Sequence, residues 1–348
     1  MNRAGYARRL DLQHGRVDMS HGSGGRAMAQ LISEVFHPAF ANEWLSRGND
    51  QAAFDAPVGR MVMSTDAYVV SPLFFPGGDI GSLAVHGTIN DVSMAGARPL
   101  YLSASFILEE GFALADLKRI ADSMGAAARD AGVPIITGDT KVVERGKADG
   151  VFISTTGVGV VQGGLDLSAD KARPDDQVLV SGFIGDHGVA IMSKRQNTAF
   201  DTDLVSDSAA LHGLVADMVA AAGLGLRVMR DPTRGGVAAV LNELAQQSGV
   251  GFLIEESALP IRPQVVAACE LLGLDPLCVA NEGKLIAVVA PEFAQSLIEA
   301  MHAHPLGRDA TIIGKVVEDD HHFVQMTTSF GGDRIIDWLS GEQLPRIC

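Results

Sequence analysis

Apolar segments of strand length that run up to an aspartate recur in this chain, and they constrain its fold more than any other feature. Residues 61–65 are typical, since they read as a buried strand that stops at Asp66. Between such segments lie helical patterns, of which 114–131 is the clearest. This alternation predicts an α/β protein with mixed sheets that binds ligands beyond the ends of its strands. The aspartates are Asp66, Asp91 within 85–97, Asp139 after 133–138, and Asp231 after 226–230.

Length and composition indicate two domains of this type. The 348 residues suffice for two ordinary domains, and 47% hydrophobic residues with 39 glycines are typical of compact, turn-rich α/β proteins. We therefore expect two related α/β domains. A formal charge of -15 argues against nucleic acid or an anionic membrane as the main partner, because both are negatively charged. For the same reason, binding a phosphate compound requires metal ions between it and the protein.

Changes in composition place the domain boundaries. Residues 1–45 are expected to form an N-terminal segment with a glycine-rich loop and a helix over 26–40. A polar loop at 46–58 opens the N-terminal domain, 46–168. A charged run at 170–176 marks the start of a C-terminal α/β domain, 169–333. The last stretch, 334–348, is expected to be a mobile tail.

Cysteine usage and hydropathy point to the cytoplasm. Only three cysteines occur, and Cys269 and Cys278 lie in apolar surroundings without the CxxC spacing of a zinc site or a redox pair. No apolar run approaches the length of a membrane span, and residues 1–9 lack the apolar core of a signal peptide. We expect a cytoplasmic protein without disulfides or structural zinc.

The four aspartates are candidate magnesium ligands. Mg2+ takes oxygen ligands and commonly combines a few carboxylates with the phosphates of a nucleotide. Any one aspartate after a strand more often caps a turn or a helix, and spacing in the sequence does not prove that the four converge. The four together favour a Mg2+–nucleotide site with Asp66, Asp91, Asp139 and Asp231 as the metal ligands.

Two glycine-containing turns are candidate phosphate cradles. Residues 22–25 precede a helix, and glycines let successive N–H groups converge on an anion. Such turns are more often plain connectors, so this signal is weak alone. The second turn, 231–236, places Arg234, a hydroxyl and two glycines at a helix N-terminus, where dipole and donors favour an anion. A glycine-assisted helix start is the alternative there.

The chain ends in cysteine, and that residue is a candidate carrier of a covalent group. Cys348 follows soon after Pro345, which prevents the tail from continuing a helix or joining a central strand. Residues 336–348 span roughly 40 Å when extended, enough to cross a domain. A prenyl anchor requires the cysteine four residues from the end and is therefore excluded. Two interpretations stay open: a terminus without function, and a swinging thiol that carries a group into an active site.

Taken together, the motifs resemble those of the HypE family of hydrogenase maturation proteins. This family belongs to the ATP-binding superfamily of aminoimidazole ribonucleotide synthetase, selenophosphate synthetase and thiamine-monophosphate kinase. The aspartate motifs are shared across that superfamily, whereas a terminal PRIC is specific to HypE. The likeness runs from His21 to Cys348 with no departure at the motifs. These are STD at 64–66, ND at 90–91, GDTK at 138–141, RDPTRGG at 230–236, ANEGK at 280–284, HPLG at 304–307 and PRIC at 345–348.

The resemblance implies a carbamoyl dehydratase. In such proteins the terminal cysteine, here Cys348, receives a carbamoyl group from the carbamoyltransferase HypF, and ATP is used to dehydrate the thiocarboxamide to a thiocyanate. The cyanide then passes to iron on the HypC–HypD complex, for the nickel–iron hydrogenase site. The family fold implies a homodimer whose N-terminal domains, which bind ATP, pair through strands into a β-barrel.

The resemblance also implies roles for single residues. Transfer of a phosphoryl group onto the carbamoyl oxygen creates a good leaving group and needs mainly positioning and charge neutralisation. We expect Lys141 to neutralise that phosphoryl group and Glu282 to accept an amide proton, so that Cys348, Lys141 and Glu282 are catalytic. Without the resemblance, a surface ion pair explains either charged residue equally well. The expected ATP-binding residues are Gly22, Ser23, Gly24, Gly25, Thr65, Asn90, Gly138, Thr140 and Arg234.

Two other functions are compatible with the aspartates. A small-molecule phosphotransferase of the same superfamily would use a diffusible acceptor and keep its turnover without Cys348. A non-enzymatic cyanide-carrying scaffold would bind ATP without hydrolysing it, even with Cys348 carbamoylated. The PRIC ending argues against the first function, and GDTK with NEGK argues against the second.

Overall fold

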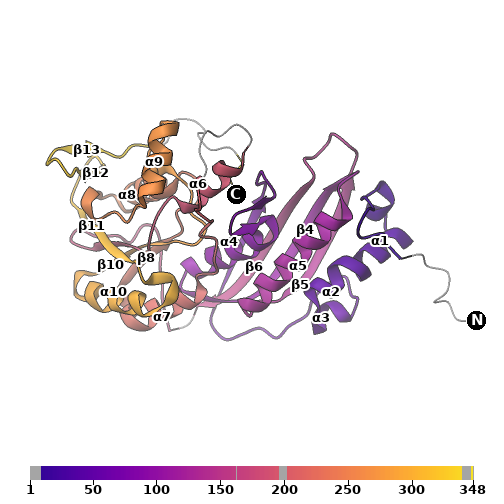
Figure 1. The fold of residues 1–348 in the computed structure, drawn as a ribbon. Coiled ribbons are helices and arrows are strands. Elements are labelled where there is room, and N and C mark those ends of the chain that lie inside the picture. Colours follow the sequence, from indigo (N-terminus) through magenta and orange to yellow (C-terminus); the bar gives the residue numbers. More distant parts are fainter. Residues whose placement is uncertain (1–8, 162, 196–201, 339–345, 348) are drawn as a thin grey trace, which may run out of the picture.

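The chain folds into two α/β domains that meet along helix α4 (Figure 1). The structure, a computed structural model, describes residues 9–161, 163–195, 202–338 and 346–347. Each domain has one main sheet, of four strands in the N-terminal domain and of seven in the C-terminal domain. The predicted fold class, two α/β domains with mixed sheets, is confirmed. None of the helices in the described part of the chain has the length and apolar character that crossing a bilayer requires.

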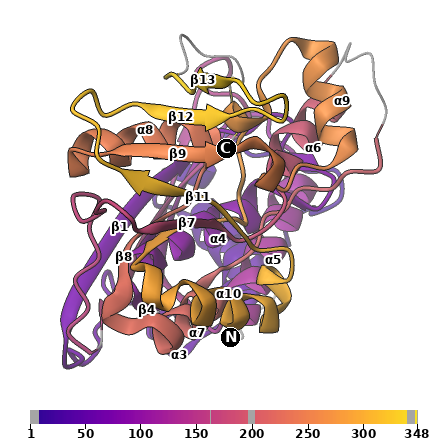
Figure 2. The same cartoon turned by 90° about the vertical axis from the view of Figure 1, so that its left-hand side faces the viewer.

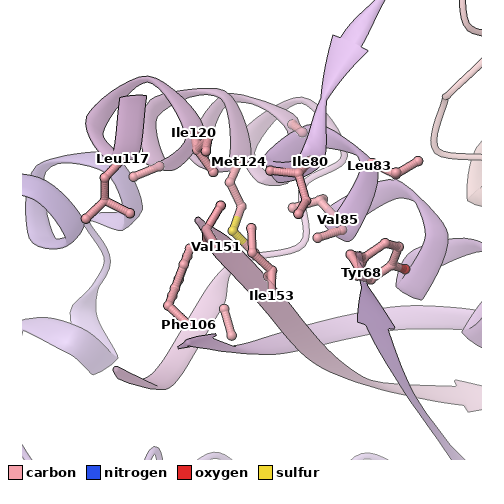
Figure 3. Packing of buried hydrophobic residues seen from close by; sticks show 14 of the residues in the cluster. Tyr68, Ile80, Leu83, Val85, Phe106, Leu117, Ile120, Met124, Val151 and Ile153 are labelled. Atoms are coloured by element: carbon pink, nitrogen blue, oxygen red, sulfur yellow. The ribbon is translucent and has the colours of Figure 1, made fainter. Parts of the chain in front are cut away.

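The N-terminal sheet has helices on one face. Its strand order is β1-β6-β4-β5, and β5 runs parallel to β4 while the other neighbours are antiparallel. A parallel pair needs a crossover connection, which α5 provides. Buried side chains of α4 and α5 pack on the sheet, as Figure 3 shows for Ile80, Ile120 and Met124. The elements are β1 (Arg60–Tyr68), α4 (Ile80–Met94), β4 (Ala97–Glu109), α5 (Leu114–Asp130), β5 (Ile135–Val143) and β6 (Val151–Val161), with a small hairpin of β2 (Phe74–Phe75) and β3 (Gly78–Asp79).

The opposite face of this sheet is open in the single chain. Side chains alternate along a strand, so Ser64 and Tyr68 of β1 point to α4, where they contact Asp91 and Thr88. The residues between them point the other way, and Met63 is 71% exposed. Residues 61–65 were predicted to form a buried strand; the strand is confirmed, but its burial is wrong. Strand β1 lies at the edge of the sheet, with one of its faces uncovered.

The N-terminal segment packs against the edge strand β5 and the helical layer. The predicted helix over 26–40 is confirmed as a continuous helical run with a π-helical turn in its middle. Its Phe36 ring lies 4.7 Å from the ring of Phe106 on β4, so the segment shares the core of the N-terminal domain. The elements are η2 (Met19–Gly22), α1 (Arg26–Leu31), η3 (Ile32–Phe36), α2 (His37–Phe40) and α3 (Glu43–Ser46).

The C-terminal domain is a seven-stranded sheet of order β13-β12-β9-β11-β7-β10-β8 (Figure 2). Helix α8 packs on one face with the buried residues of β9 and β11, and α7 and α10 pack on the other with those of β8 and β10. The strands are β7 (Gln177–Val180), β8 (Leu226–Arg230), β9 (Gly251–Glu255), β10 (Ile286–Val289), β11 (Thr311–Val317), β12 (Val324–Thr327) and β13 (Asp333–Ile335). The helices are α6 (Asp186–Lys194), α7 (His212–Ala222), α8 (Gly236–Ser248), α9 (Pro263–Leu272) and α10 (Ala294–Ala303), with short turns η4 (Gly223–Gly225), η5 (Glu256–Ala258), η6 (Pro276–Cys278), η7 (Pro291–Phe293) and η8 (Pro305–Gly307).

The predicted start of the mobile tail, at residue 334, lies too early in the sequence. Strand β13 pairs with β12 through Ile335, and the backbone N–H of Ile336 donates to the carbonyl of Val324 over 2.8 Å. The Ile336 side chain is buried in the core of the C-terminal domain. The predicted boundary after 333 therefore cuts a strand, because three exposed residues hid the pairing that continues to Ile336.

Candidate active site

A small pocket at the junction of the two domains collects four of the predicted acidic residues. It measures about 30 Å³, which is room for a water or a metal ion but not for a nucleotide. Both domains contribute, since the first half of its lining comes from β1 and α4 and the second half from two C-terminal loops. The lining residues are Asp66, Ala67, Tyr68, Gly87, Asp91, Asp231, Thr233, Arg234 and Glu282.

Strand β1 and helix α4 place the N-terminal carboxylates. Asp66 and Ser64 share the helix-covered face of β1, two residues apart. The Ser64 hydroxyl donates a 2.7 Å hydrogen bond to Oδ2 of Asp91. Asp91 does not end a strand, as its sequence context suggested, but lies on the last turns of α4, which crosses above β1. A strand and a helix thus bring together two carboxylates that are 25 residues apart in the printed sequence.

Two C-terminal loops place the other carboxylates, and Asn281 ties these loops together. Its backbone N–H and its side-chain Nδ2 both donate to the carbonyl of Pro232, over 3.0 and 2.9 Å. Asp231 precedes that proline and Glu282 follows the asparagine, so these bonds set the two carboxylates side by side. Gly236 starts α8 with φ of 61°, and a Cβ there would lie 2.4 Å from the carbonyl oxygen of Leu277. Only glycine fits this close approach.

Burial and mutual repulsion make the carboxylates of this pocket costly to ionise. Burial, and next the Asp91 carboxylate, raise the pKa of Asp231 to about 7. Burial also raises the pKa of Asp91, against the hydrogen bond from Ser64, with Asp66 adding to the rise. Burial and then Asp231 raise the pKa of Glu282 well above its ordinary value, and Oε1 of Glu282 has no hydrogen-bond partner among the described residues. A bound cation would relieve this repulsion.

Asp139 and Lys141 lie elsewhere in the single chain. Strands β1 and β5 are the two edges of the sheet, three strand spacings or about 14 Å apart. Asp139 aligns through β4 and β6 with Ala67, so it projects from the open face, opposite to Asp66. There Asp139 pairs with Lys141 over 2.7 Å, and this bond lowers the pKa of Asp139. The four aspartates therefore do not converge within one chain.

The glycine-rich turn accompanies this second group. Gly22 lies against β5, where a Cβ would approach the backbone nitrogen of Val142 to 2.6 Å. A Cβ placed on Gly24 or Gly25 would meet no atom of the described residues within 4 Å, so the space beside these glycines is open. A separate apolar pocket of about 120 Å³ adjoins this group, lined in part by Met28, Phe36, Gly138 and Thr140. The predicted site residues thus form two groups, the junction group (Asp66, Asp91, Asp231, Arg234, Glu282) and the β5 group (22–25, 138–141).

Two residues that were expected to bind ATP form hydrogen bonds within the protein instead. Asn90 is 1% exposed, and its side chain donates to the carbonyl of Ala209 and accepts from the N–H of Leu211. It therefore joins α4 to the C-terminal domain and does not face the pocket, because the helix turns it away from Asp91. Thr65 lies on the open face of β1 and bonds to Thr156 on β6. Cys348 lies outside the described residues.

Sequence reasoning missed the residues that hold the junction group in place. Ser64 and Asn281 stand directly beside predicted motif residues, so their position in the STD and NEGK motifs was an available signal. Asp207 also holds this group, because its Oδ1 accepts a hydrogen bond from the N–H of Glu282 over 3.0 Å. Its role could not be predicted from the sequence, since it lies in a loop without a motif. No three carboxylate, imidazole or thiol groups in the described ranges come close enough to hold a metal ion by themselves.

Comparison with known proteins identifies the family. Residues 48–161 match the N-terminal domain of the AIR synthase related proteins, and residues 173–327 match their C-terminal domain. The chain is 75% identical over 343 residues to carbamoyl dehydratase HypE of Bradyrhizobium diazoefficiens, covering 99% of each chain. The chain belongs to the HypE family of carbamoyl dehydratases. This confirms the resemblance that the motifs indicated.

Solved HypE structures share the whole fold. A hydrogenase maturation protein HypE crystallised in complex with ATP superimposes with a TM-score of 0.91 at 49% identity, over 95% of this chain and 99% of that one. A HypE from a HypE–HypF complex superimposes with a TM-score of 0.78 at 50% identity, over 89% and 99%. The HypE fold, with its two AIR-synthase-related domains, therefore extends over essentially the full length of the chain.

Proposed function

We propose that this chain uses ATP to dehydrate a carbamoyl group on the thiol of Cys348 to a thiocyanate, the source of the cyanide ligand for the iron of a nickel–iron hydrogenase. The junction group carries the proposal, because a buried glutamate with an unpaired oxygen stands beside carboxylates suited to a Mg2+–phosphate complex. The end of the chain supports it as well. Ser71, three residues after Tyr68 of the pocket, donates to the carbonyl of Arg346 over 3.1 Å.

The chemistry follows from the charges of the two groups. Mg2+ held by the aspartates would neutralise the nucleotide phosphates, and with few protein ligands it keeps positions open for phosphate oxygens. Lys141 would neutralise the phosphoryl group as it moves to the carbamoyl oxygen. Glu282 would accept the amide proton when the phosphorylated oxygen leaves. Burial is the main cause of the raised pKa of Glu282, and the neighbouring carboxylates, Asp231 first, add to it. A bound cation that neutralised these carboxylates would lower that pKa, so proton abstraction would follow loading of the site.

This reaction predicts a definite mass change. The protein is carbamoylated with HypF and carbamoyl donor, and intact mass is then recorded before and after addition of ATP and Mg2+. We expect a carbamoyl adduct on the C-terminal peptide that loses one water only when ATP is present. A stable adduct, or an adduct on Cys269 or Cys278, would rule out the proposed reaction.

The two groups of site residues also support a homodimer. The open face of the N-terminal sheet carries Asp139 and Lys141 of the β5 group together with exposed apolar side chains, among them Met61, Met63 and Ile107, which are 46%, 71% and 43% exposed. We propose that two copies pair through these strands into a β-barrel, as the family fold implies. The β5 group of one copy then faces the junction group of the other, and each active site is shared between two chains.

A complementation experiment tests the shared site. Asp91→Asn removes a junction carboxylate and Lys141→Ala removes a β5 cation, so each variant alone is expected to be inactive. After unfolding and refolding as a mixture, half of the dimers are mixed and each contains one intact site, which restores about a quarter of wild-type dehydration. Asp91→Asn mixed with Asp231→Asn is the matched control and should stay inactive. No recovery in the first mixture would show that each site lies within one chain.

The proposed partners and location follow from the family. HypF would supply the carbamoyl group, in line with the crystallised HypE–HypF complex. The HypC–HypD complex would accept the cyanide. We place these exchanges in the cytoplasm.

A further inference from the structure

The last two described residues are held through their backbone at the junction of the domains. The carbonyl of Arg346 accepts from the N–H of Ser71 over 3.1 Å and from Nη2 of Arg195 over 2.8 Å. The carbonyl of Ile347 is 2.8 Å from Nε2 of His187. The Ile347 side chain is 3% exposed and belongs to the core of the N-terminal domain. Residues of both domains thus form hydrogen bonds to the chain just before its final residue.

His187 occupies this junction as a fully buried, neutral ring. It is 0% exposed, its ring is edge-on to Phe75 at 5.6 Å, and burial lowers its pKa. A carbonyl oxygen only accepts hydrogen bonds, so Nε2 must carry the proton. The other nitrogen, Nδ1, then accepts from the hydroxyl of Ser206, 2.7 Å away. Both nitrogens are therefore used, and the tautomer is fixed by its neighbours.

The segment after Ser206 leads directly to Glu282. Asp207 accepts the Glu282 N–H through Oδ1 over 3.0 Å and pairs through Oδ2 with Lys284 over 3.2 Å. The N–H of Ala209 approaches the Glu282 carbonyl at 3.4 Å. A short chain of contacts therefore runs from the carbonyl of Ile347 through His187 and Ser206 to the backbone of Glu282.

We propose that His187 is a positioning residue for the dehydration, which fixes the chain end relative to Glu282. This inference rests on the proposed function, because it concerns the approach of the Cys348 thiol to that carboxylate. The hydrogen bonds to the chain end involve only its backbone carbonyls, and the buried Ile347 side chain adds packing contacts. The contacts that carry this inference are therefore made by Arg346 and Ile347 and not by the thiol or its group.

Two substitutions at one position separate positioning from general stability. Gln can place a side-chain N–H where Nε2 of histidine lies, whereas Asn reaches only as far as Nδ1. His187→Asn should therefore lose the bond to Ile347 and His187→Gln should keep it. In a single turnover of carbamoylated protein, we expect His187→Asn to slow the loss of water about tenfold, the effect of about one hydrogen bond, and His187→Gln to stay close to wild type.

Two further readouts make the result specific. ATP affinity and carbamoylation by HypF should be unchanged in both variants. Hydrogen exchange at the Ser71 amide, which reports the docked Arg346 carbonyl, should be faster in His187→Asn than in His187→Gln. Deletion of 346–348 gives the exchange rate of the undocked state.

The outcomes differ for the two proposals. Equal rates of water loss in His187→Asn and wild type would overturn the positioning role while the proposed function stands. Slow water loss in both variants, with Ser71 exchange unchanged, would overturn it too, since stability alone would then explain the loss. A wild-type protein that never loses water would overturn the proposed function, and the positioning role with it.

Discussion

Replacing Asp231 with asparagine is expected to abolish ATP-dependent dehydration, with a loss of at least about 100-fold in the single-turnover rate. The substitution keeps the size of the side chain and removes the charge that lies next to Asp91 at the domain junction. Without that charge, the proposed Mg2+–phosphate complex would lose one of its carboxylate ligands. The measurement is the ATP-dependent loss of water from carbamoylated protein, together with ATP affinity by calorimetry.

The same substitution is expected to raise the melting temperature of the nucleotide-free protein at pH 8. The pKa of Asp231 is raised from 3.8 to about 7 in the folded chain, so the folded state binds the proton more tightly than the unfolded state does. Stability therefore falls as the pH rises from 4 towards 7, because ionisation costs more in the folded state. Asparagine removes this cost. We expect a rise on the order of a few degrees at pH 8 and little change at pH 4.

Asp217 provides the control, because it is an exposed aspartate on α7 of the same domain. Asp217→Asn should change neither the rate nor the pH dependence of melting. A lower melting temperature for Asp231→Asn at pH 8, or normal dehydration, would contradict the assignment of Asp231 to the metal site.

Replacing Glu282 with glutamine should separate nucleotide binding from chemistry. Loss of a general base typically reduces a rate by about 10² to 10⁴, and we expect dehydration to fall by at least about 100-fold. ATP affinity should stay near wild type, since this side chain is proposed to act on the amide proton and not on the phosphates. The folded protein should tolerate the change, because glutamine has the same shape and removes a carboxyl group whose ionisation is disfavoured by burial and then by Asp231, which raise its pKa.

Single-turnover mass spectrometry and ATP calorimetry measure the two effects. Glu270→Gln, on the exposed side of α9, is the matched control and should be silent in both. Dehydration at the wild-type rate in Glu282→Gln would show that another group takes the amide proton. Loss of ATP binding would instead place Glu282 among the nucleotide ligands.

The sequence predicted the fold class and three of the four junction carboxylates as metal ligands, because strand ends and glycine turns are local signals. It did not predict how the aspartates are distributed. Asp139 and Asp66 both follow apolar runs, yet they project from opposite faces of one sheet. The face of a strand residue depends on register with its neighbours, which come from distant parts of the chain. Motifs carry no register, so they did not reveal that the two groups lie apart within one chain.

The sequence did not predict that one face of β1 is exposed, for a similar reason. Residues 61–65 alternate methionine with smaller residues, which suits a buried strand or an edge strand with one open face equally well. Only the strand order reveals the edge. The resemblance through the ND motif at 90–91 implied that Asn90 binds ATP beside Asp91, but adjacent residues of a helix point about 100° apart. The helix therefore offers the site only one residue of that pair.

Asn90 also has a consequence for how substrates arrive. One side chain joins α4 to three backbone groups of the other domain, those of Ala209, Leu211 and Glu282. Separating the domains there would break these three hydrogen bonds, at a net cost on the order of 0.5 to 1.5 kcal/mol for each. These bonds stabilise the packing of the two domains against each other. We therefore expect ATP and the modified chain end to reach the carboxylates without separation of the domains at α4.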